Sequence, residues 1–185
     1  MAYSAANVDH AWIGTNGQAL FQQKTGCPVL LLNDADAAGI AEVRYGAAKN
    51  HPGLVILTTL GTGIGTAIVY RGVLIPNSEL GHIEVDGYDA ESRAASSARD
   101  REGLSFKDWA KRLQRYYDRL EAVLWPDLIV VGGGISRKAD KFLPLLKLNA
   151  EIVPAKLQNT AGIVGAAWLT YDRQLNPAPT SLSSP

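Results

Sequence analysis

A glycine-rich turn between two apolar segments, LVILTTLGTGIGTAIVYRGVLI at residues 54–75, is the feature that most constrains the fold. LVILTTL has the continuous apolar character of a buried strand, and IVYRGVLI continues in β-branched residues without helix-start signals. Two strands joined by so short a turn must run antiparallel. Because other apolar segments of the chain alternate with helical patterns, the sequence predicts an α/β fold with a mixed sheet flanked by helices. A purely parallel, doubly wound sheet would not contain this hairpin.

The remaining strands and helices follow from apolar periodicity and from helix-start signals. Ser105, with Asp108 three residues later, predicts a helix start, and Pro126 ends the apolar pattern that follows. Asn159 or Thr160 is expected to cap the last helix. The predicted strands are CPVLLL (27–32), DLIVV (127–131) and EIVPA (151–155), and the predicted helices span 19–24, 34–48, 89–102, 106–123 and 159–173.

Composition narrows the classes of protein to which the chain can belong. Lys plus Arg equals Asp plus Glu at 18 each, so no net charge attracts nucleic acid or an anionic membrane. The single cysteine, Cys27, excludes an internal disulfide framework and a multi-cysteine zinc site. No apolar run approaches the ~18 residues of a membrane span, and no signal segment opens the chain. We therefore expect a soluble, cytoplasmic protein.

Two glycine turns are candidate phosphate sites. Gly61, Gly63 and Gly65, with the Thr62 and Thr66 hydroxyls beside them, would offer bare backbone N–H groups to anionic oxygens. An ordinary tight hairpin that needs glycine for positive φ explains them equally well. The second turn, at 132–134, joins a strand to a helix start, where phosphate binding and close strand–helix packing are both open. Neither turn carries the GK[ST] of a P-loop.

Polar residues at strand ends form a second candidate group. Asn33 and Asp34 follow three leucines, and Glu79 and His82 enclose the segment ELGH. Carboxylates and amides of this kind can hydrogen-bond the hydroxyls of a polyol. Alternatively, Asp34 caps a helix and His82 is a turn histidine bonded to backbone. Glu91 joins this group only weakly.

Basic residues recur every four positions along the helix predicted at 106–123. Such a stripe can follow a long polyanion, but the neighbouring Asp108, Asp118 and Glu121 favour a solvated face. The stripe consists of Lys107, Lys111, Arg115 and Arg119.

Several ordered motifs together resemble the ROK family of sugar kinases, most closely its polyphosphate-using actinobacterial glucokinase branch. The resemblance covers residues 6–167 and rests on LNDADAAGIAE, LTTLGTGIGTAIV, ELGHIEVDG, IVVGGGISRKADKFLPLL and EIVPAKLQNTAGIVGAA. It implies the actin-like, ribonuclease-H-like ATPase fold and transfer of a phosphoryl group from ATP or inorganic polyphosphate to the 6-hydroxyl of glucose. It also implies Mg²⁺, held mainly through the phosphate donor, and a possible homodimer.

The resemblance also implies roles for individual residues. Asp34 is the general base, and Asn33 contacts a sugar hydroxyl. Glu79, His82 and Glu91 bind the sugar, although the similarity around Glu91 is thinner. The phosphate-binding residues are Gly61, Thr62 and Gly63 in the first turn and Gly133 and Gly134 in the second.

Two departures from the family pattern shape the expectations. The cysteine cluster that follows the histidine in many members is absent, so no zinc is expected. No Asp-x-Gly-Gly-Thr loop lies before Asp34, so the chain is expected to lack the first lobe and to phosphorylate glucose poorly alone. The expected organisation is a lobe remnant (1–32), a sugar-kinase lobe (33–158), a helix (159–174) and a disordered tail (175–185). A non-catalytic sugar-binding protein and an inactive remnant remain alternatives.

Overall fold

The computed structural model describes residues 9–175 of the 185-residue chain, with side chains to residue 172. The chain divides between Leu32 and Asn33 into two compact units, which are described separately. The assignment of these units to family lobes stays a prediction, and the expected tail lies almost wholly outside the described residues. No helix in the described part of the chain is both long and apolar enough to cross a membrane.

The first unit contains two short helices, η1 (His10–Trp12) and α1 (Gly17–Thr25). The predicted helix at 19–24 is confirmed, and Gly26 ends it with a left-handed φ of +69°. The strand predicted at CPVLLL is wrong: residues 28–32 form no strand, and Leu31 is 51% exposed. An apolar run becomes a strand only beside a hydrogen-bonding neighbour, and no described strand pairs with this one.

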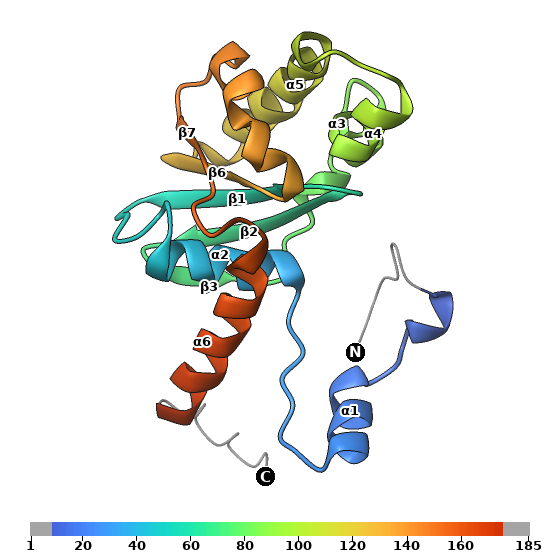
Figure 1. The fold of residues 1–185 in the computed structure, drawn as a ribbon, viewed down its shortest axis with the longest axis vertical. Helices are drawn as coiled ribbons and strands as arrows, with labels where there is room; N and C mark the ends of the chain where they lie inside the picture. The colour runs from blue at the N-terminus through green and yellow to red at the C-terminus, as the bar shows by residue number, and fades with distance from the viewer. Residues whose placement is uncertain (1–8, 176–185) are drawn as a thin grey trace. The chain divides into compact units, whose positions relative to one another are not determined.

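The second unit is built on a five-stranded mixed sheet with the order β3-β2-β1-β6-β7 (Figure 1). The predicted hairpin is confirmed, because β1 (Leu54–Leu60) pairs antiparallel with β2 (Ile64–Tyr70) through seven residue pairs. A turn at Arg71-Gly72 leads to β3 (Val73–Ile75), the antiparallel edge strand. On the other side β6 (Leu128–Gly132) and β7 (Glu151–Pro154) run parallel to β1, as the mixed sheet requires.

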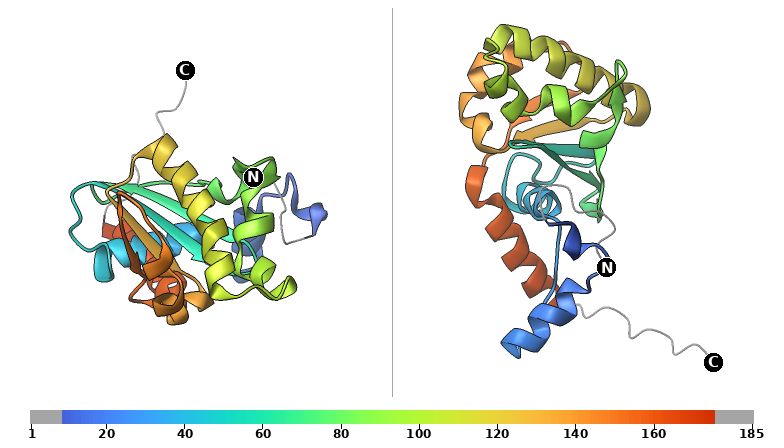
Figure 2. Two further views of the ribbon diagram at one scale, coloured as in Figure 1. Left: turned by 90° about the horizontal axis from the view of Figure 1, so that it is seen from above. Right: turned by 90° about the vertical axis from the view of Figure 1, so that its right-hand side faces the viewer.

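Helices cover both faces of this sheet (Figures 1 and 2). On one face α5 (Phe106–Leu124) buries Trp109, Leu113, Tyr116, Tyr117 and Leu120 in the larger hydrophobic core. The helix start predicted at Ser105 is confirmed, because its Oγ accepts a hydrogen bond from the Asp108 N–H at 3.1 Å. The single helix predicted at 89–102 is instead two, α3 (Ala90–Ala94) and α4 (Ser96–Arg101), with a break at Ala95.

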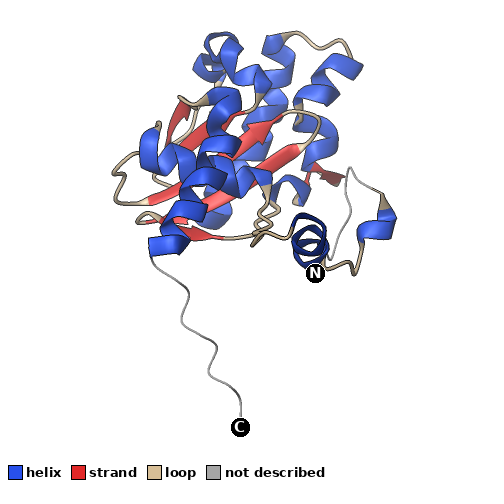
Figure 3. Cartoon of the chain, turned by 60° about the horizontal axis from the view of Figure 1, so that its bottom comes forward, coloured by secondary structure: helices blue, strands red, loops and turns tan. Residues whose placement is uncertain are grey.

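The opposite face carries α2 (Asp34–Tyr45) and α6 (Ala161–Leu175), which lie side by side (Figure 3). Small residues allow close packing on two sides of α2. A Cβ on Gly165 of α6 would meet the Ala37 carbonyl oxygen of α2, and a Cβ on Gly39 of α2 would meet the Ala67 Cβ of β2. The short helix η5 (Gln158–Thr160) leads into α6, and the Thr160 hydroxyl donates to the Leu157 carbonyl at 2.6 Å. That hydroxyl is thus used within the turn.

A buried carboxylate fixes the end of α2. Glu42 is 1% exposed and accepts hydrogen bonds from the backbone N–H groups of Ala47 (2.6 Å), Leu157 (2.7 Å) and Lys156 (3.2 Å). Buried charge is tolerated only where its hydrogen bonds are made. Glu42 therefore joins the loop after α2 to the segment that begins α6.

Two of the four residues of the basic stripe on α5 form ion pairs. Lys111 bonds Asp108 at 2.7 Å, and Arg115 makes two hydrogen bonds to Asp86, at 2.6 and 3.0 Å. Asp86 lies in the turn between the two-residue strands β4 (Glu84–Val85) and β5 (Tyr88–Asp89). These pairs favour the solvated-face interpretation.

Candidate active site

Both glycine turns lie at the same end of the sheet. Thr59, near the end of β1, pairs with Gly65 of β2 on one side and with Gly132 of β6 on the other. Gly133 has φ +81°, and a Cβ there would meet the backbone of Leu60 at 2.5 to 2.9 Å. Gly134 then begins η3 (Gly134–Lys141), a 3₁₀ helix, so the predicted helix start is confirmed only as this tighter form. The second turn is thus packed against the first.

The first turn of α2 lies beside the same hairpin. A Cβ on Gly65 would be 3.0 Å from the Cβ of Ala35. The amide oxygen of Asn33 caps the helix by accepting from the N–H groups of Ala35 (2.8 Å) and Asp36 (3.3 Å). The alternative interpretation of Asp34 as the cap is therefore wrong. Asp34 is exposed at the first helical position, which leaves its carboxylate available for chemistry.

A second acid, Asp36, takes part in this region. Asp36 is fully buried, and its Oδ2 accepts the Asn77 N–H at 2.9 Å. Its Oδ1 is buried without a hydrogen-bond partner among the described residues. Burial raises the pKa of Asp36, the Asn77 N–H opposes this shift, and the charge of Asp34 adds to it. Asp36 thus ties α2 to the loop that leads to Glu79.

The tip of the hairpin contacts Glu91 on α3. Glu91 Oε2 accepts the Ile64 N–H at 2.7 Å, and a Cβ on Gly63 would overlap that carboxylate. Gly61, Gly63 and Gly65 all lack positive φ, so the explanation by turn conformation is wrong. Gly63 and Gly65 serve close approach, whereas a Cβ on Gly61 would meet nothing within 4 Å. The structure thus brings Glu91 to the glycine turn, which its sequence signal only weakly suggested.

The ELGH segment lies against β2. It forms η2 (Leu80–His82), where a Cβ on Gly81 would overlap the Ile64 carbonyl oxygen. The Thr66 hydroxyl accepts the Leu80 N–H at 3.0 Å and donates to the Ser78 carbonyl at 2.9 Å. Glu79 and His82 remain exposed on either side of this anchored segment. Anchored backbone with exposed polar side chains is suited to ligand contact.

His82 is held by a carboxylate, so the interpretation as a backbone-bonded turn histidine is wrong. Its Nδ1 lies 2.9 Å from Asp89 Oδ2, and Asp89 also caps α3. The hydrogen bond that His82 donates to Asp89 raises the pKa of His82, burial opposes the shift, and the charges of Asp89, Glu91 and Glu79 add to it. The pair orients the imidazole, with Nδ1 taken up by Asp89.

This pair predicts a pH dependence that can be measured directly. Because the folded-state pKa of His82 exceeds its unfolded value, the stabilisation of the folded state by the pair of His82 and Asp89 is fully present below about pH 6.5. It is lost as the pH rises through the raised pKa. In an NMR titration Asp89→Asn should lower the His82 pKa, whereas Asp86→Asn, in the same hairpin, should not. An unchanged His82 titration in Asp89→Asn would contradict this account.

The described residues hold no group of three or more His, Cys, Asp or Glu side chains placed to bind a metal. Mg²⁺ in phosphoryl-transfer sites commonly uses one or two carboxylates together with the phosphates of the substrate. Two glycine turns at one end of the sheet, with few carboxylates beside them, fit an ion that would be carried mainly by the phosphates of the donor. Three residues that shape this region were not among the predicted site residues: Asp36, Asp89 and Ser97, which contacts the hairpin tip. Aspartate and serine are common at helix starts, so only their contacts distinguish these three residues from ordinary helix-start residues.

Comparisons with known proteins show which family the chain is similar to. Residues 2–103 match the model of the ROK family. The chain is 57% identical over 165 residues to a polyphosphate glucokinase of Mycobacterium tuberculosis, covering 89% of this chain and 62% of that protein. A polyphosphate glucokinase of Mycobacterium leprae is 55% identical over 165 residues, with 89% and 51% covered. The chain thus spans between half and two thirds of the length of these relatives.

Solved structures show the same fold. The inorganic polyphosphate/ATP-glucomannokinase of Arthrobacter sp. strain KM superposes with a TM-score of 0.90 at 51% identity, covering 94% of this chain and 68% of that one. A ROK family glucokinase of Streptomyces griseus, solved with glucose and AMPPNP, gives a TM-score of 0.77 at 24% identity, with 90% and 75% covered. At that identity the second similarity concerns the fold alone. The expected actin-like sugar-kinase fold is therefore confirmed.

Proposed function

The chain belongs to the ROK family, and on that premise we propose that it acts in transferring a phosphoryl group from inorganic polyphosphate or ATP to the 6-hydroxyl of glucose. The similarity to polyphosphate glucokinases and to a polyphosphate/ATP-glucomannokinase supports this reaction class. The observation that carries the proposal is the position of Asp34. It is exposed at the start of α2, beside a glycine hairpin, and Asn33 has taken over the capping role.

Asp34 is the proposed general base. Its carboxylate takes the proton from the sugar 6-hydroxyl as the hydroxyl oxygen attacks the terminal phosphorus of the donor. The bond from that phosphorus to the bridging oxygen breaks, and the shortened donor leaves with the electron pair. A positioned base typically contributes ~10²–10⁴-fold to the rate. Stabilisation of the charge on the transferred phosphoryl group contributes the larger part of the rate enhancement.

Sugar binding is assigned to side chains around Asp34. Glu79 and His82 are exposed at the ends of an anchored segment, and Glu91 reaches the same hairpin from α3. Asp36 connects the two regions through its bond to the Asn77 N–H. We propose that Asn33, Glu79, His82 and Glu91 bind glucose hydroxyls and so hold the 6-hydroxyl against Asp34.

Donor binding is assigned to the two glycine turns. Gly61, Thr62 and Gly63 form the hairpin tip, and Gly133 and Gly134 lie beside the end of β1. Bare backbone N–H groups suit phosphate oxygens. Mg²⁺, when bound with the donor, would supply charge neutralisation. A cytoplasmic location and a homodimer stay predictions.

The test separates binding from turnover. Glucose binding is measured by calorimetry on the 185-residue chain. Glucose 6-phosphate formation is measured on the chain and on a chimera in which it replaces the aligned segment of the Mycobacterium tuberculosis relative. Glucose binding with chimera turnover supports the proposal. Binding without turnover would favour a non-catalytic sugar-binding protein, and neither would favour an inactive chain.

A further inference from the structure

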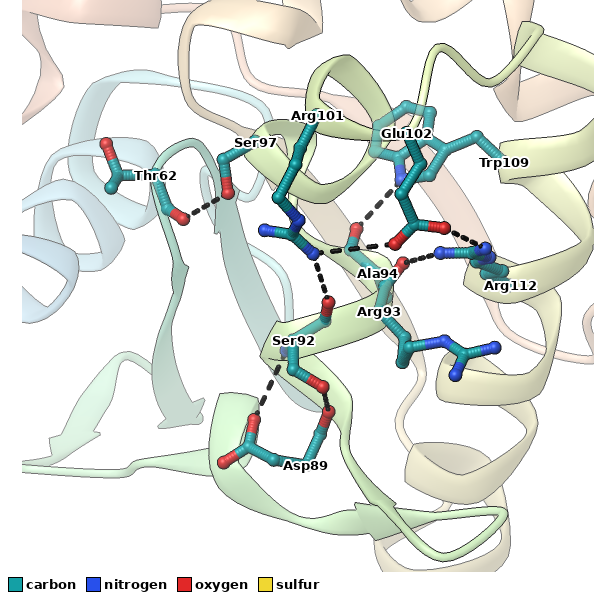
Figure 4. Close-up of polar contacts among 10 residues, drawn as sticks. All are labelled: Thr62, Asp89, Ser92, Arg93, Ala94, Ser97, Arg101, Glu102, Trp109 and Arg112. Atoms are coloured by element: carbon teal, nitrogen blue, oxygen red, sulfur yellow. Dashed lines mark hydrogen bonds and ion pairs between the residues drawn. The ribbon is translucent and has the colours of Figure 1, made fainter.

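Ser97 makes two hydrogen bonds to the tip of the glycine hairpin, and Figure 4 shows the one to Thr62. Its backbone N–H donates to the Gly61 carbonyl at 3.0 Å, and its Oγ donates to the Thr62 carbonyl at 2.6 Å. Ser97 lies on α4, 35 residues further along the chain from Thr62. The contact is therefore a tertiary one, specific to this loop.

The peptide geometry gives these two bonds a consequence. In a planar trans peptide the carbonyl of one residue and the N–H of the next point in opposite directions, and the described residues contain no cis peptide bond. Holding the Gly61 and Thr62 carbonyls against α4 therefore turns the N–H groups of Thr62 and Gly63 away from α4. Successive N–H groups aimed to one side form a concavity that suits an anion.

The other backbone groups of the tip are already in use. The Gly61 N–H donates to the Gly63 carbonyl at 2.9 Å, and the Ile64 N–H donates to Glu91 at 2.7 Å. Within residues 9–175, no acceptor takes a hydrogen bond from the Thr62 or Gly63 N–H. Thr62 itself is exposed. The tip thus has two free donors, and they are the two that Ser97 orients.

The helix that carries Ser97 is held on the body of the protein (Figure 4). Arg101 donates to the Ser92 carbonyl at 2.9 Å, and Arg112 of α5 bonds Glu102 at 2.5 Å. The buried indole N–H of Trp109 donates to the Ala94 carbonyl at 3.0 Å. These bonds hold α3 and α4 against α5. The backbone position of Ser97 is therefore fixed relative to α5.

We propose that Ser97 is a positioning residue for the phosphate donor: it holds the hairpin tip so that the Thr62 and Gly63 N–H groups face the donor phosphate. This inference rests on the proposed function, since it takes the hairpin tip as the donor loop. Ser97 itself does not touch the donor. Its hydroxyl acts through the Thr62 peptide, which it orients before the donor arrives.

The experiment compares Ser97→Ala, Ser97→Thr and Ser92→Ala in the full chain, with tripolyphosphate and glucose as probes. Ser97→Ala removes the Oγ bond but keeps the N–H bond, and Ser97→Thr keeps a hydroxyl. Ser92→Ala is the matched control, because it removes a serine-to-backbone bond of 2.6 Å in the neighbouring helix without touching the hairpin. Backbone amide NMR resolves the two peptide groups.

In the parent chain tripolyphosphate should shift the Thr62 and Gly63 amide signals. Ser97→Ala should weaken tripolyphosphate binding about tenfold, the effect of one hydrogen bond. It should also reduce those two shifts while glucose binding is retained. Ser97→Thr should restore binding, and Ser92→Ala should match the parent.

The outcomes distinguish this inference from the function on which it rests. Equal tripolyphosphate binding by the parent and Ser97→Ala would overturn the role of Ser97 and leave the donor loop intact. Binding that shifts other amides but not those of Thr62 and Gly63 would also overturn it. If the parent chain bound neither tripolyphosphate nor glucose, the proposed function would be overturned, and the inference with it.

Discussion

Asp34→Asn should remove nearly all glucose phosphorylation while leaving glucose binding in place. The amide keeps the size of the carboxylate and one accepting oxygen, but its nitrogen is a donor and it does not take up the proton of the 6-hydroxyl. We expect kcat to fall by ~10²–10⁴-fold. The measurement is a coupled assay of glucose 6-phosphate in the chimera, together with calorimetric titration of glucose.

Asp118→Asn is the matched control for this prediction. Asp118 is exposed on α5, where it accepts a hydrogen bond from Gln114 at 2.7 Å, and it belongs to no proposed site. Its substitution makes the same chemical change and should leave turnover unaltered. Near-normal turnover in Asp34→Asn would remove Asp34 from the mechanism, whatever the glucose affinity.

Glu42→Ala is expected to lower the free energy of unfolding more than any other substitution proposed for this chain. The substitution leaves the N–H groups of Ala47, Lys156 and Leu157 without their acceptor inside the protein. Hydrogen bonds to charged groups contribute about 1.5–3 kcal/mol each, so the loss of three should lower the free energy of unfolding by at least about 4.5 kcal/mol. Urea unfolding followed by tryptophan fluorescence measures this loss.

Two further variants make the test specific. Glu42→Gln keeps one carbonyl oxygen in a side chain of the same shape, so it should lose only part of the stability. Glu151→Ala removes an exposed glutamate on β7 and should unfold at the same urea concentration as the parent. Equal urea midpoints for Glu42→Ala and the parent would show that the three N–H groups find other partners.

The sheet was predictable because its strands carry their own signals. The apolar run of β6 is buried throughout, those of β1 and β2 are buried over most of their length, and the glycine turn after β1 allows only a hairpin. CPVLLL carries a similar apolar signal and forms no strand, because strand pairing depends on a neighbour that local sequence does not specify. Local pattern thus identifies candidate strands, and the sheet selects among them.

The candidate site was only partly predictable for a related reason. The glycine turns stand next to strand ends, and Asn33 and Asp34 follow an apolar run, so position along the sequence alone suggests function. Asp36 lies in a run in which every residue from 35 to 43 is buried, so no periodicity singles it out. Ser97 is one of several serines near a helix start, and its contact with Thr62 joins elements far apart in the chain.

The carboxylate of Glu42 also constrains the order of events during synthesis. Glu42 lies 114 residues before Lys156 and 115 residues before Leu157, and the backbone N–H groups of both donate to its carboxylate. A growing chain therefore cannot complete the end of α2 until residue 157 has left the ribosome, however early α2 forms its own turns. Contacts of such sequence separation slow folding. The end of the helix that carries the proposed base is thus fixed only after more than a hundred further residues have been translated.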